Sequence, residues 1–337
     1  MPTMIYPFSL NACGLSRIPK RILFTEDKMK NGQSKTYRVA LAQFAPAYLN
    51  KEATLAKALD ILQKASHASA QLVAFGETWF PGYPAWLDVC PEAALWNHEP
   101  TKRVFARLRQ NSVIVPGPEV QALAQAAGDL KLAVVIGINE RVESGPGRGT
   151  LYNTLLTFTP EGRLGNTHRK LMPTYTERLI WGQGDGTGLN AVDAGGVRVG
   201  GLICWEHWMP LARMAMHNSG EHIHVAVWPT VHERHQLASR HYAFEGRCFV
   251  LAVGLLMPRS DLPEEFAGFA DRAHAWIERG GSAIIAPDSH YVVEPVFERE
   301  ELIIADLDLN EIDKESMTLD VTGHYARPDV FKFEVKG

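Results

Sequence analysis

The stretch VRVGGLICWEHWMP, residues 197–210, decides the fold. Its first part, residues 197–203, is nearly all apolar or glycine, which predicts a strand buried on both faces. A helix is expected after Pro210, near residues 211–219. Cys204 therefore falls on the turn between a strand and a helix. In α/β proteins such turns face the crevice at the end of the sheet, where sites are built.

The same alternation of strand and helix continues on both sides of this stretch. Strand-like apolar runs occur at residues 37–44, 71–76, 132–138, 223–228, 249–253, 283–286 and 302–305. After the first of them, Leu55 and Leu59 recur at helical spacing, and Asn50 is placed to cap that helix. Strands that are apolar on both faces lie inside layers covered by helices, so the pattern predicts an α/β fold.

The composition excludes several classes of protein. Of the 337 residues, 46% are hydrophobic and 21% charged, a balance that is typical of a globular chain with a large core. The net charge of −4 provides no electrostatic basis for binding nucleic acid or an anionic membrane. No apolar run approaches the ~18 residues of a membrane span. We therefore expect no nucleic-acid partner and no membrane partner.

The cysteines indicate a reducing compartment. Four are present, far apart and without a C-x-x-C pair: Cys13, Cys90, Cys204 and Cys248. This pattern excludes a small disulfide scaffold and disfavours a thiolate zinc cage. Reduced thiols are typical of a cytoplasmic protein, which is the localisation that we expect.

Residues 1–36 form a basic arm with six basic and two acidic side chains, a local charge of +4. The apolar stretch near residues 4–10 is short, is interrupted by Pro7 and follows no charged region, which does not fit a secretory signal. Organelle targeting stays open for this arm. A mobile extension, or one that clasps a partner, is the interpretation that the sequence favours.

Three side chains are candidates for chemistry. Cys204, expected to be partly exposed beside backbone N–H donors, is suited to form a thiolate, although most free cysteines are simply buried. Glu77 follows a strand of apolar residues, so partial desolvation would raise its pKa into the range of a general base, whereas a solvated acid is the plainer interpretation. Lys170, taken alone, is typical of a surface charge.

Two other patterns carry less weight. Residues 182–188 are rich in glycine but lack G-K-[ST], a strand before them and a helix after them, so they do not predict a nucleotide site. Several histidines crowd one segment: His217, His222, His224, His232 and His235. Two of them would share one face of a strand, as metal ligands do, but no H-E-x-x-H spacing occurs and ordinary hydrogen bonds are favoured.

Three longer motifs resemble one known family. They are FGETWFPGYPAW at residues 75–86, HRKLMPTYTERLIWGQGDG at residues 168–186, and GGLICWEHWMP at residues 200–210. Together they resemble the nitrilase superfamily of carbon–nitrogen hydrolases, over residues 37–330. The resemblance implies a catalytic triad of Glu77, Lys170 and Cys204, with Glu177 as the second glutamate. The run Cys-Trp-Glu-His at residues 204–207 is similar to the nitrilase branch.

The resemblance also implies an architecture. The family fold is a four-layer α-β-β-α sandwich, whose subunits pair into an α-β-β-α-α-β-β-α dimer. We expect an N-terminal arm at residues 1–36, a catalytic domain at residues 37–310 and a tail at residues 311–337 that lies at a subunit interface. A homo-oligomer is therefore expected. Filament-forming members of the family often carry a longer tail than this chain, so long filaments are not implied.

The implied reaction converts a small-molecule nitrile into a carboxylic acid and ammonia. Cys204 attacks the nitrile carbon, and Glu77 carries the protons through a thioimidate and then a thioester. Lys170, together with the backbone N–H of Trp205, stabilises the developing charge. Glu177 holds Lys170, and the indole of Trp205 is a candidate wall of the substrate pocket. No metal or organic cofactor is implied.

Several alternatives stay open at this point. Within the superfamily, cyanide hydrolysis or hydration and amide hydrolysis compete with the nitrilase reaction. A non-catalytic assembly protein on the same scaffold, and a metalloprotein that uses the histidines, are the competing classes. Four more aromatic residues are as well explained by core as by pocket: Trp79, Tyr83, Trp86 and Trp181.

Overall fold

A computed structural model describes residues 36–269 and 274–336. The chain divides into residues 1–33 and a compact unit of residues 34–337, and only this second unit is described below. Apart from Thr36, the basic arm lies outside the described residues, as does Cys13. In the described ranges, no helix has both the length and the apolar character needed to cross a bilayer.

The described strands make two sheets. The strands are β1 (Thr36–Gln43), β2 (Leu72–Phe75), β3 (Ala133–Arg141), β4 (Leu151–Phe158), β5 (Leu164–Arg169), β6 (Val192–Asp193), β7 (Arg198–Ile203), β8 (Ile223–Trp228), β9 (Phe249–Gly254), β10 (Leu256–Pro258), β11 (Trp276–Ile285), β12 (Tyr291–Phe297) and β13 (Glu301–Asp308). The first sheet has the order β13-β1-β2-β3-β4-β5. The second has the order β10-β11-β9-β8-β7-β6, with β12 paired to β11.

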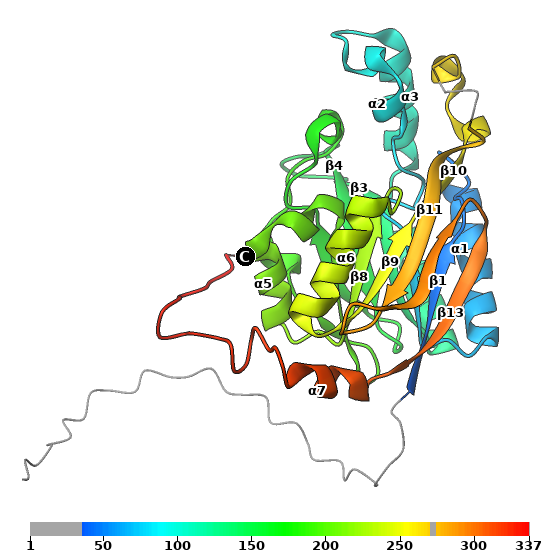
Figure 1. Ribbon diagram of the computed structural model, residues 1–337. Helices are drawn as coiled ribbons and strands as arrows, with labels where there is room; N and C mark the ends of the chain where they lie inside the picture. The colour runs from blue at the N-terminus through cyan, green and yellow to red at the C-terminus, as the bar shows by residue number, and fades with distance from the viewer. Residues whose placement is uncertain (1–35, 270–273, 337) are drawn as a thin grey trace, which may run out of the picture. The chain divides into compact units, whose positions relative to one another are not determined.

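Helices cover the outer face of each sheet. The α-helices are α1 (Lys51–His67), α2 (Trp86–Val89), α3 (Glu99–Asn111), α4 (Pro118–Leu130), α5 (Pro210–Asn218), α6 (Glu233–Gly246) and α7 (Asn310–Ser316). The 3₁₀ turns are η1 (Pro91–Ala94), η2 (Tyr175–Leu179), η3 (Gly186–Gly188), η4 (Cys204–Trp208), η5 (Arg259–Asp261) and η6 (Glu264–Phe266). Figure 1 shows α5 and α6 packed over β8 and β9.

The alternation of side chains along β1 shows how the layers form. Val39 and Leu41 enter the core that also holds the residues of the second sheet. Ala40 and Ala42 enter a separate core with α1, α3 and α4. Because successive strand residues point to opposite faces, one apolar run supplies two cores. The result is the predicted α-β-β-α sandwich, and the expected α/β class is confirmed.

Strand direction brings the functional segments to one edge. In the first sheet β1, β2 and β3 run parallel, and two antiparallel steps through β4 return β5 to the direction of β2. In the second sheet β7, β8 and β9 run parallel. Glu77 follows β2, Lys170 follows β5, and Cys204 follows β7. All three therefore lie at carboxyl ends of strands.

Some elements have too weak a pattern to be recognised from sequence. β5 is half exposed and mostly polar, and α3 is amphipathic but has few apolar residues, of which only Val104 and Leu108 are buried. Residues 79–100, which show no strand or helix periodicity, contain α2, η1 and the start of α3. After α7 the tail has no regular structure, and its end packs closely against Gly186.

Candidate active site

Glu77 is positioned by a close approach between β2 and β3. It lies two residues beyond the end of β2, and its side chain is fully buried. A Cβ atom at Gly137 of β3 would lie 2.4 Å from the carbonyl oxygen of Gly76 and 2.5 Å from the nitrogen of Thr78. Only glycine therefore lets β3 support the turn that carries Glu77.

Cys204 occupies a strained turn. Its φ of +53° lies in the left-handed region, which is costly for a residue with a Cβ and is found most often at functional sites. The turn is held from both sides: Ile203 N donates to Glu206 Oε2 over 2.7 Å, and His207 Nδ1 donates to the Cys204 carbonyl over 2.7 Å. These bonds fix the backbone on both sides of Cys204 and thereby the direction in which its side chain points.

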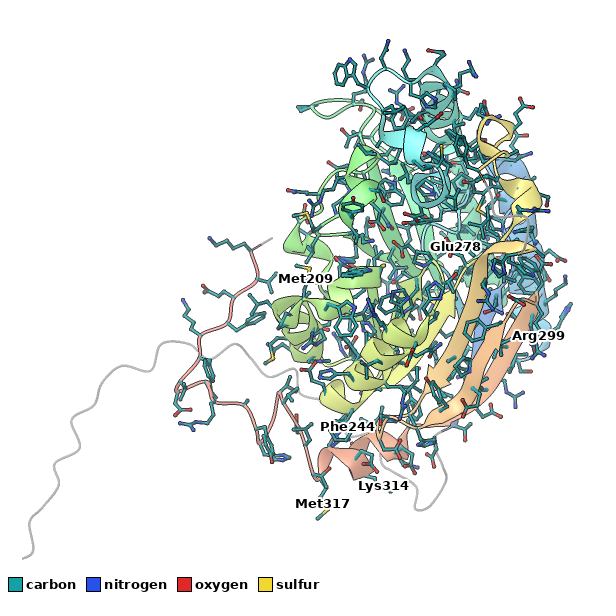
Figure 2. The ribbon with its side chains drawn as sticks, turned by 45° about the horizontal axis from the view of Figure 1, so that its top comes forward. Met209, Phe244, Glu278, Arg299, Lys314 and Met317 are labelled. Carbon is teal, nitrogen blue, oxygen red and sulfur yellow. The ribbon has the colours of Figure 1, made fainter. Side chains whose placement is uncertain are left out.

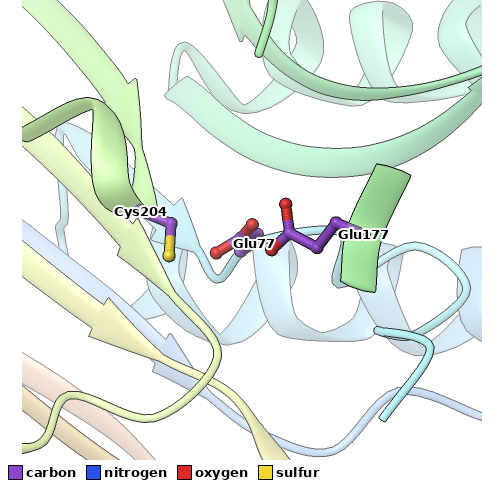
Figure 3. Close-up of side chains that lie close together, drawn as sticks. All are labelled: Glu77, Glu177 and Cys204. Atoms are coloured by element: carbon purple, nitrogen blue, oxygen red, sulfur yellow. The ribbon is translucent and has the colours of Figure 1, made fainter. Parts of the chain in front are cut away.

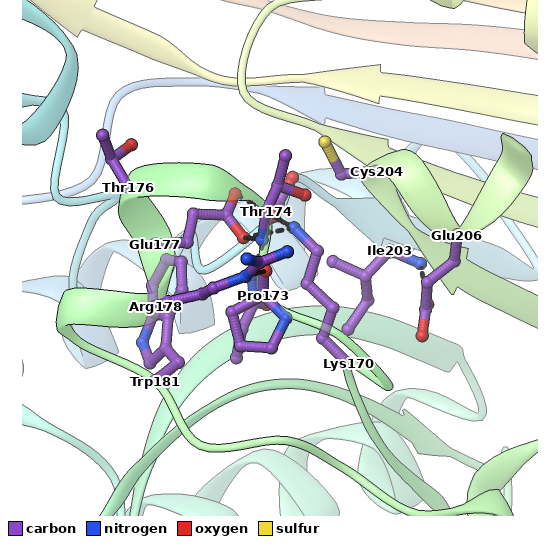
Figure 4. Close-up of polar contacts among 12 residues, drawn as sticks. Lys170, Pro173, Thr174, Thr176, Glu177, Arg178, Trp181, Ile203, Cys204 and Glu206 are labelled. Atoms are coloured by element: carbon purple, nitrogen blue, oxygen red, sulfur yellow. Dashed lines mark hydrogen bonds and ion pairs between the residues drawn. The ribbon is translucent and has the colours of Figure 1, made fainter.

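Lys170 is a buried cation held between two carboxylates, and its interpretation as a surface charge is wrong. Its Nζ donates to Glu77 Oε1 over 2.9 Å and to both oxygens of Glu177, over 3.0 and 2.7 Å. Figure 4 shows the contact with Glu177. Burial by itself would lower the pKa of Lys170, but Glu77, Cys204 and Glu177 hold it well above its usual value. The ammonium form is therefore maintained.

Glu177, in η2, is an anchored carboxylate. Besides Lys170, it accepts hydrogen bonds from the backbone N of Thr174 over 2.7 Å and from the hydroxyl of Tyr83 over 3.0 Å. With all these donors both oxygens are occupied. The predicted contact between Glu177 and Lys170 is present, and its geometry suits a group that holds the lysine in place.

Glu77, by contrast, keeps one oxygen available. Its Oε1 accepts from Lys170 and from Asn153 Nδ2, the latter over 2.7 Å. Its Oε2 is buried and has no hydrogen-bond partner among the described residues. Burial raises the pKa of Glu77 to about 7, although Lys170 opposes this shift. The group is thus poised to take up and release a proton near neutral pH.

The thiol of Cys204 faces these carboxylates. One oxygen of Glu77, one of Glu177 and the Cys204 Sγ all lie within 4.8 Å of one another (Figure 3). Burial raises the pKa of Cys204 well above its usual value and Glu77 adds to the rise, while Lys170 and the N–H of Trp205 oppose it.

The expectation of a partly exposed cysteine that readily forms a thiolate is wrong, because only 3% of Cys204 is exposed. The strand end lies in the interior, where burial disfavours the charged thiolate. The thiol therefore has to lose its proton to a neighbouring base as it attacks.

A cavity of about 290 Å³ opens in front of the thiol. The lining includes Tyr83, Asp88, Glu177, Cys204, Trp205 and Glu278. Trp205, the predicted wall, lines it and is 51% exposed. Of the other aromatic candidates only Tyr83 lines this cavity. Trp79, Trp86 and Trp181 belong to the core beneath the first sheet.

Glu206 is a buried acid whose role the sequence analysis missed. It accepts from Ile203 N, from Leu171 N over 2.8 Å and from His168 Nε2 over 2.9 Å. Burial would raise its pKa, but His168 and the two backbone N–H groups hold it below its usual value. Glu206 thereby ties the end of β7 to the residue after Lys170. The sequence feature that could have indicated this role is the position of Glu206 inside the mostly apolar motif of residues 200–210.

The histidines do not assemble a metal site. Among the described residues, the group with metal-ligand geometry is Glu77, Glu177 and Cys204, and there the ammonium of Lys170 already neutralises the carboxylates. Two of the histidines expected to make ordinary hydrogen bonds do so. His224 Nδ1 pairs with Glu221 Oε2 over 2.8 Å, and His222 Nδ1 accepts from Arg198 N.

The fold and this geometry agree with comparisons to known proteins. The profile of the carbon-nitrogen hydrolase family matches residues 38–314. The chain therefore belongs to the carbon-nitrogen hydrolase family, and the superfamily expected from the motifs is confirmed.

Relatives of high similarity carry nitrilase names. The chain is 40% identical over 302 residues to an aliphatic nitrilase of Sinorhizobium fredii, covering 89% of this chain and 95% of that protein. It is 38% identical over 323 residues to a bifunctional nitrilase/nitrile hydratase of Nicotiana tabacum, covering 93% and 90%.

Solved structures agree on the fold. A carbon-nitrogen hydrolase from Helicobacter pylori has a TM-score of 0.67 at 15% identity, covering 88% of this chain and 97% of that one. A nitrilase-superfamily member from Saccharomyces cerevisiae has a TM-score of 0.64 at 20% identity, covering 87% and 97%.

Proposed function

We propose that this protein hydrolyses organic nitriles to carboxylic acids and ammonia, with Cys204 as nucleophile, Glu77 as proton carrier and Lys170 as fixed positive charge. The observation that carries the proposal is the free Glu77 Oε2 beside the buried thiol, with Lys170 holding the other oxygen. The nitrilase names of the relatives support nitriles as the substrate class.

The first half of the reaction forms a bond between sulfur and carbon. Cys204 Sγ attacks the nitrile carbon while its proton passes to Glu77, and the carboxyl then delivers that proton to the nitrile nitrogen. The product is a neutral thioimidate. Lys170 and the N–H of Trp205 stabilise the charge that develops during the attack. A group with a pKa of about 7 suits both steps, because it takes and returns protons at similar cost.

The second half consumes two waters. Addition of the first water to the thioimidate gives a tetrahedral intermediate, and transfer of a proton to its nitrogen lets ammonia leave as a thioester forms. Glu77 then removes a proton from the second water, which attacks the thioester carbon. Cleavage of the C–S bond releases the carboxylic acid and restores the thiol.

A substrate panel tests the proposal. Matched nitriles, the corresponding amides and cyanide are assayed for ammonia, acid and amide products, with kcat/KM reported for each. Nitriles are expected to exceed amides and cyanide, with the acid as product. The relative named as bifunctional makes the amide a product worth measuring. Turnover of amides alone, or of cyanide alone, would replace the nitrilase proposal with the corresponding alternative.

We also propose a homodimer through the outer face of the second sheet. Large apolar side chains are exposed there on η4, α5, α6 and the residue between η4 and α5: Trp208, Met209, Leu211, Leu237 and Phe244. Figure 2 labels Met209 and Phe244. Burial of such a patch would remove apolar area from water.

Light scattering of Leu237→Glu, with Val292→Glu on another element as control, tests this interface. A monomer from the first variant and a dimer from the second are expected. A dimer from both would place the interface elsewhere. The cytoplasmic localisation, which the free buried thiols Cys90, Cys204 and Cys248 favour, also stays a prediction.

A further inference from the structure

The cavity in front of Cys204 carries an unusual balance of charge. Three carboxyl side chains line it, from Asp88, Glu177 and Glu278, and no lysine or arginine of the described residues does. Burial lowers the pKa of the lining histidines His232 and His235, so both rings are neutral at pH 7. The approach to the thiol is therefore rich in hydrogen-bond acceptors and poor in positive charge.

Apart from Asp88, Glu278, on β11, is the carboxyl in this lining that the proposed reaction leaves unused. Only 7% of Glu278 is exposed. Figure 2 labels its position. Thr230 is the described side chain that bonds to it, donating from Oγ1 to Oε2 over 2.6 Å. The same Thr230 oxygen accepts from Arg279 N over 2.9 Å, which directs its hydroxyl proton at Glu278.

This environment leaves Glu278 under-satisfied. A carboxylate accepts up to about four hydrogen bonds, and in the described part of the chain Glu278 has one, with no cation paired to it. Burial raises its pKa to about 8, with Asp88 and Glu77 adding to the rise and Thr230 opposing it. At pH 7 the unliganded side chain is therefore mostly the neutral acid. A bound hydrogen-bond donor would complete its bonding, and a cationic donor would favour its carboxylate form.

The topology places Glu278 within reach of a substrate bound at Cys204. Thr230 follows β8, which is the direct neighbour of β7, and Glu278 bonds to Thr230. In the sheet order β11 is the third strand from β7, but beyond the end of β8 Val231 N donates to Gly280 O, so the segment that carries Thr230 lies directly beside β11. At ~4.8 Å per strand, Glu278 and Cys204 are then roughly two strand spacings apart. Both line the same cavity. A short nitrile whose reacting carbon meets the thiol would therefore bring its other end to Glu278.

We propose that Glu278, held by Thr230, determines substrate specificity by accepting a hydrogen bond from a hydroxyl or ammonium group at the far end of the nitrile. The proposal rests on the proposed nitrilase function and names the substrate class of the same site. A nitrile that carries a carboxylate at that end is disfavoured, because it would face Asp88 and no lysine or arginine of the described residues lines the cavity to pair with it.

Four nitriles of matched chain length, ending in methyl, hydroxyl, ammonium and carboxylate, test this class. We expect the wild-type kcat/KM for the hydroxyl and ammonium compounds to exceed that for the methyl compound by about tenfold or more. The carboxylate compound is expected to be the poorest. Equal values for all four, or a preference for methyl or carboxylate, would overturn the inference while the nitrilase function stood. No turnover of any nitrile would instead overturn the proposed function.

Two variants assign the preference to Glu278. Glu278→Leu should reduce the ratio of hydroxyl to methyl kcat/KM to about one, mainly through KM of the hydroxyl compound. Glu278→Gln keeps the shape and one acceptor, so the ammonium preference should fall more than the hydroxyl preference. The surface variant Glu298→Gln serves as control and should keep all ratios. A parallel loss for every substrate in both Glu278 variants would assign Glu278 a structural role and overturn the inference.

Discussion

Cys204 lies between two buried sets of ionisable side chains. In front of its thiol is the catalytic cluster of Glu77, Lys170 and Glu177. Behind its carbonyl is a second set, here called the rear network, which consists of His207, His217, His224, Glu221 and Tyr242. His207 donates from Nδ1 to the Cys204 carbonyl, and its Nε2 accepts from His224 Nε2 over 3.0 Å.

The two sets differ in how their carboxylates are satisfied. Glu221 receives Tyr242 OH on Oε1 and His224 Nδ1 on Oε2, and although burial opposes it, the histidines lower its pKa to about 2. Within the described ranges Glu77 has donors on one oxygen alone, and burial raises its pKa to about 7. Equal burial thus makes one glutamate a permanent anion and the other a proton carrier. Each has two donors among the described residues, but those of Glu221 lie one on each oxygen and include a histidine. Both donors of Glu77 share Oε1, and the neighbouring Glu177 raises its pKa further.

The largest expected difference between the catalytic cluster and the rest of the interior comes from replacing a cysteine. Cys204→Ala removes the nucleophile, so ammonia release should fall to background in a variant that keeps its circular dichroism spectrum. Cys248→Ala is the control, since Cys248 is also buried and its pKa is raised by burial and by Glu221. It should keep its activity. Substantial turnover by folded Cys204→Ala would refute the proposed mechanism.

The second-largest effect on activity is expected from replacing the buried cation Lys170. Lys170→Arg keeps the charge, but a planar guanidinium does not fit between Glu77 and Glu177. We expect a loss in kcat of about 10²–10³, the scale of removing an oxyanion donor. Arg213→Lys, which alters the contact with Glu245 near the rear network, should stay within a few-fold. If Lys170→Arg also stayed within a few-fold, Lys170 would be structural.

The dependence of kcat/KM on pH is expected to follow the protonation of the Glu77 carboxyl. Its carboxylate form accepts the thiol proton, so kcat/KM should rise as pH increases through about 7 and fall about tenfold per unit below it. Glu77→Gln should remove both activity and this limb. A limb centred near the ordinary pKa of glutamate, about 4.3, would show that burial does not tune this group.

The smallest effect is expected from the rear network. Tyr242→Phe removes the hydroxyl that donates to buried Glu221, which costs about 1–3 kcal/mol in the free energy of unfolding. The melting temperature should drop by a few degrees while kcat/KM stays within a few-fold. Calorimetry and the nitrile assay together check this. A large drop in kcat with unchanged stability would assign the rear network a catalytic part.

Part of the fold could be predicted because its signals are local. The run at residues 197–203 is apolar on both faces, and the strand β7 occurs there with Cys204 directly after it. Asn50 caps α1 by accepting from Ala53 N, as its position predicts. The half-exposed β5 and α3, which has few apolar residues, could not be recognised, since their stability comes from neighbouring elements rather than from their own pattern.

The sequence by itself determined the family and the alternation of strands and helices. It also identified the candidate glutamates, lysine and cysteine, because each of these features depends on a contiguous stretch of residues. Only the tertiary structure decided that Lys170 is buried, that Cys204 holds its proton and that Glu278 faces the same cavity. Those properties depend on desolvation and on partners from segments distant in the chain. The pKa of a side chain follows from the sum of these surroundings, which no local stretch of sequence contains.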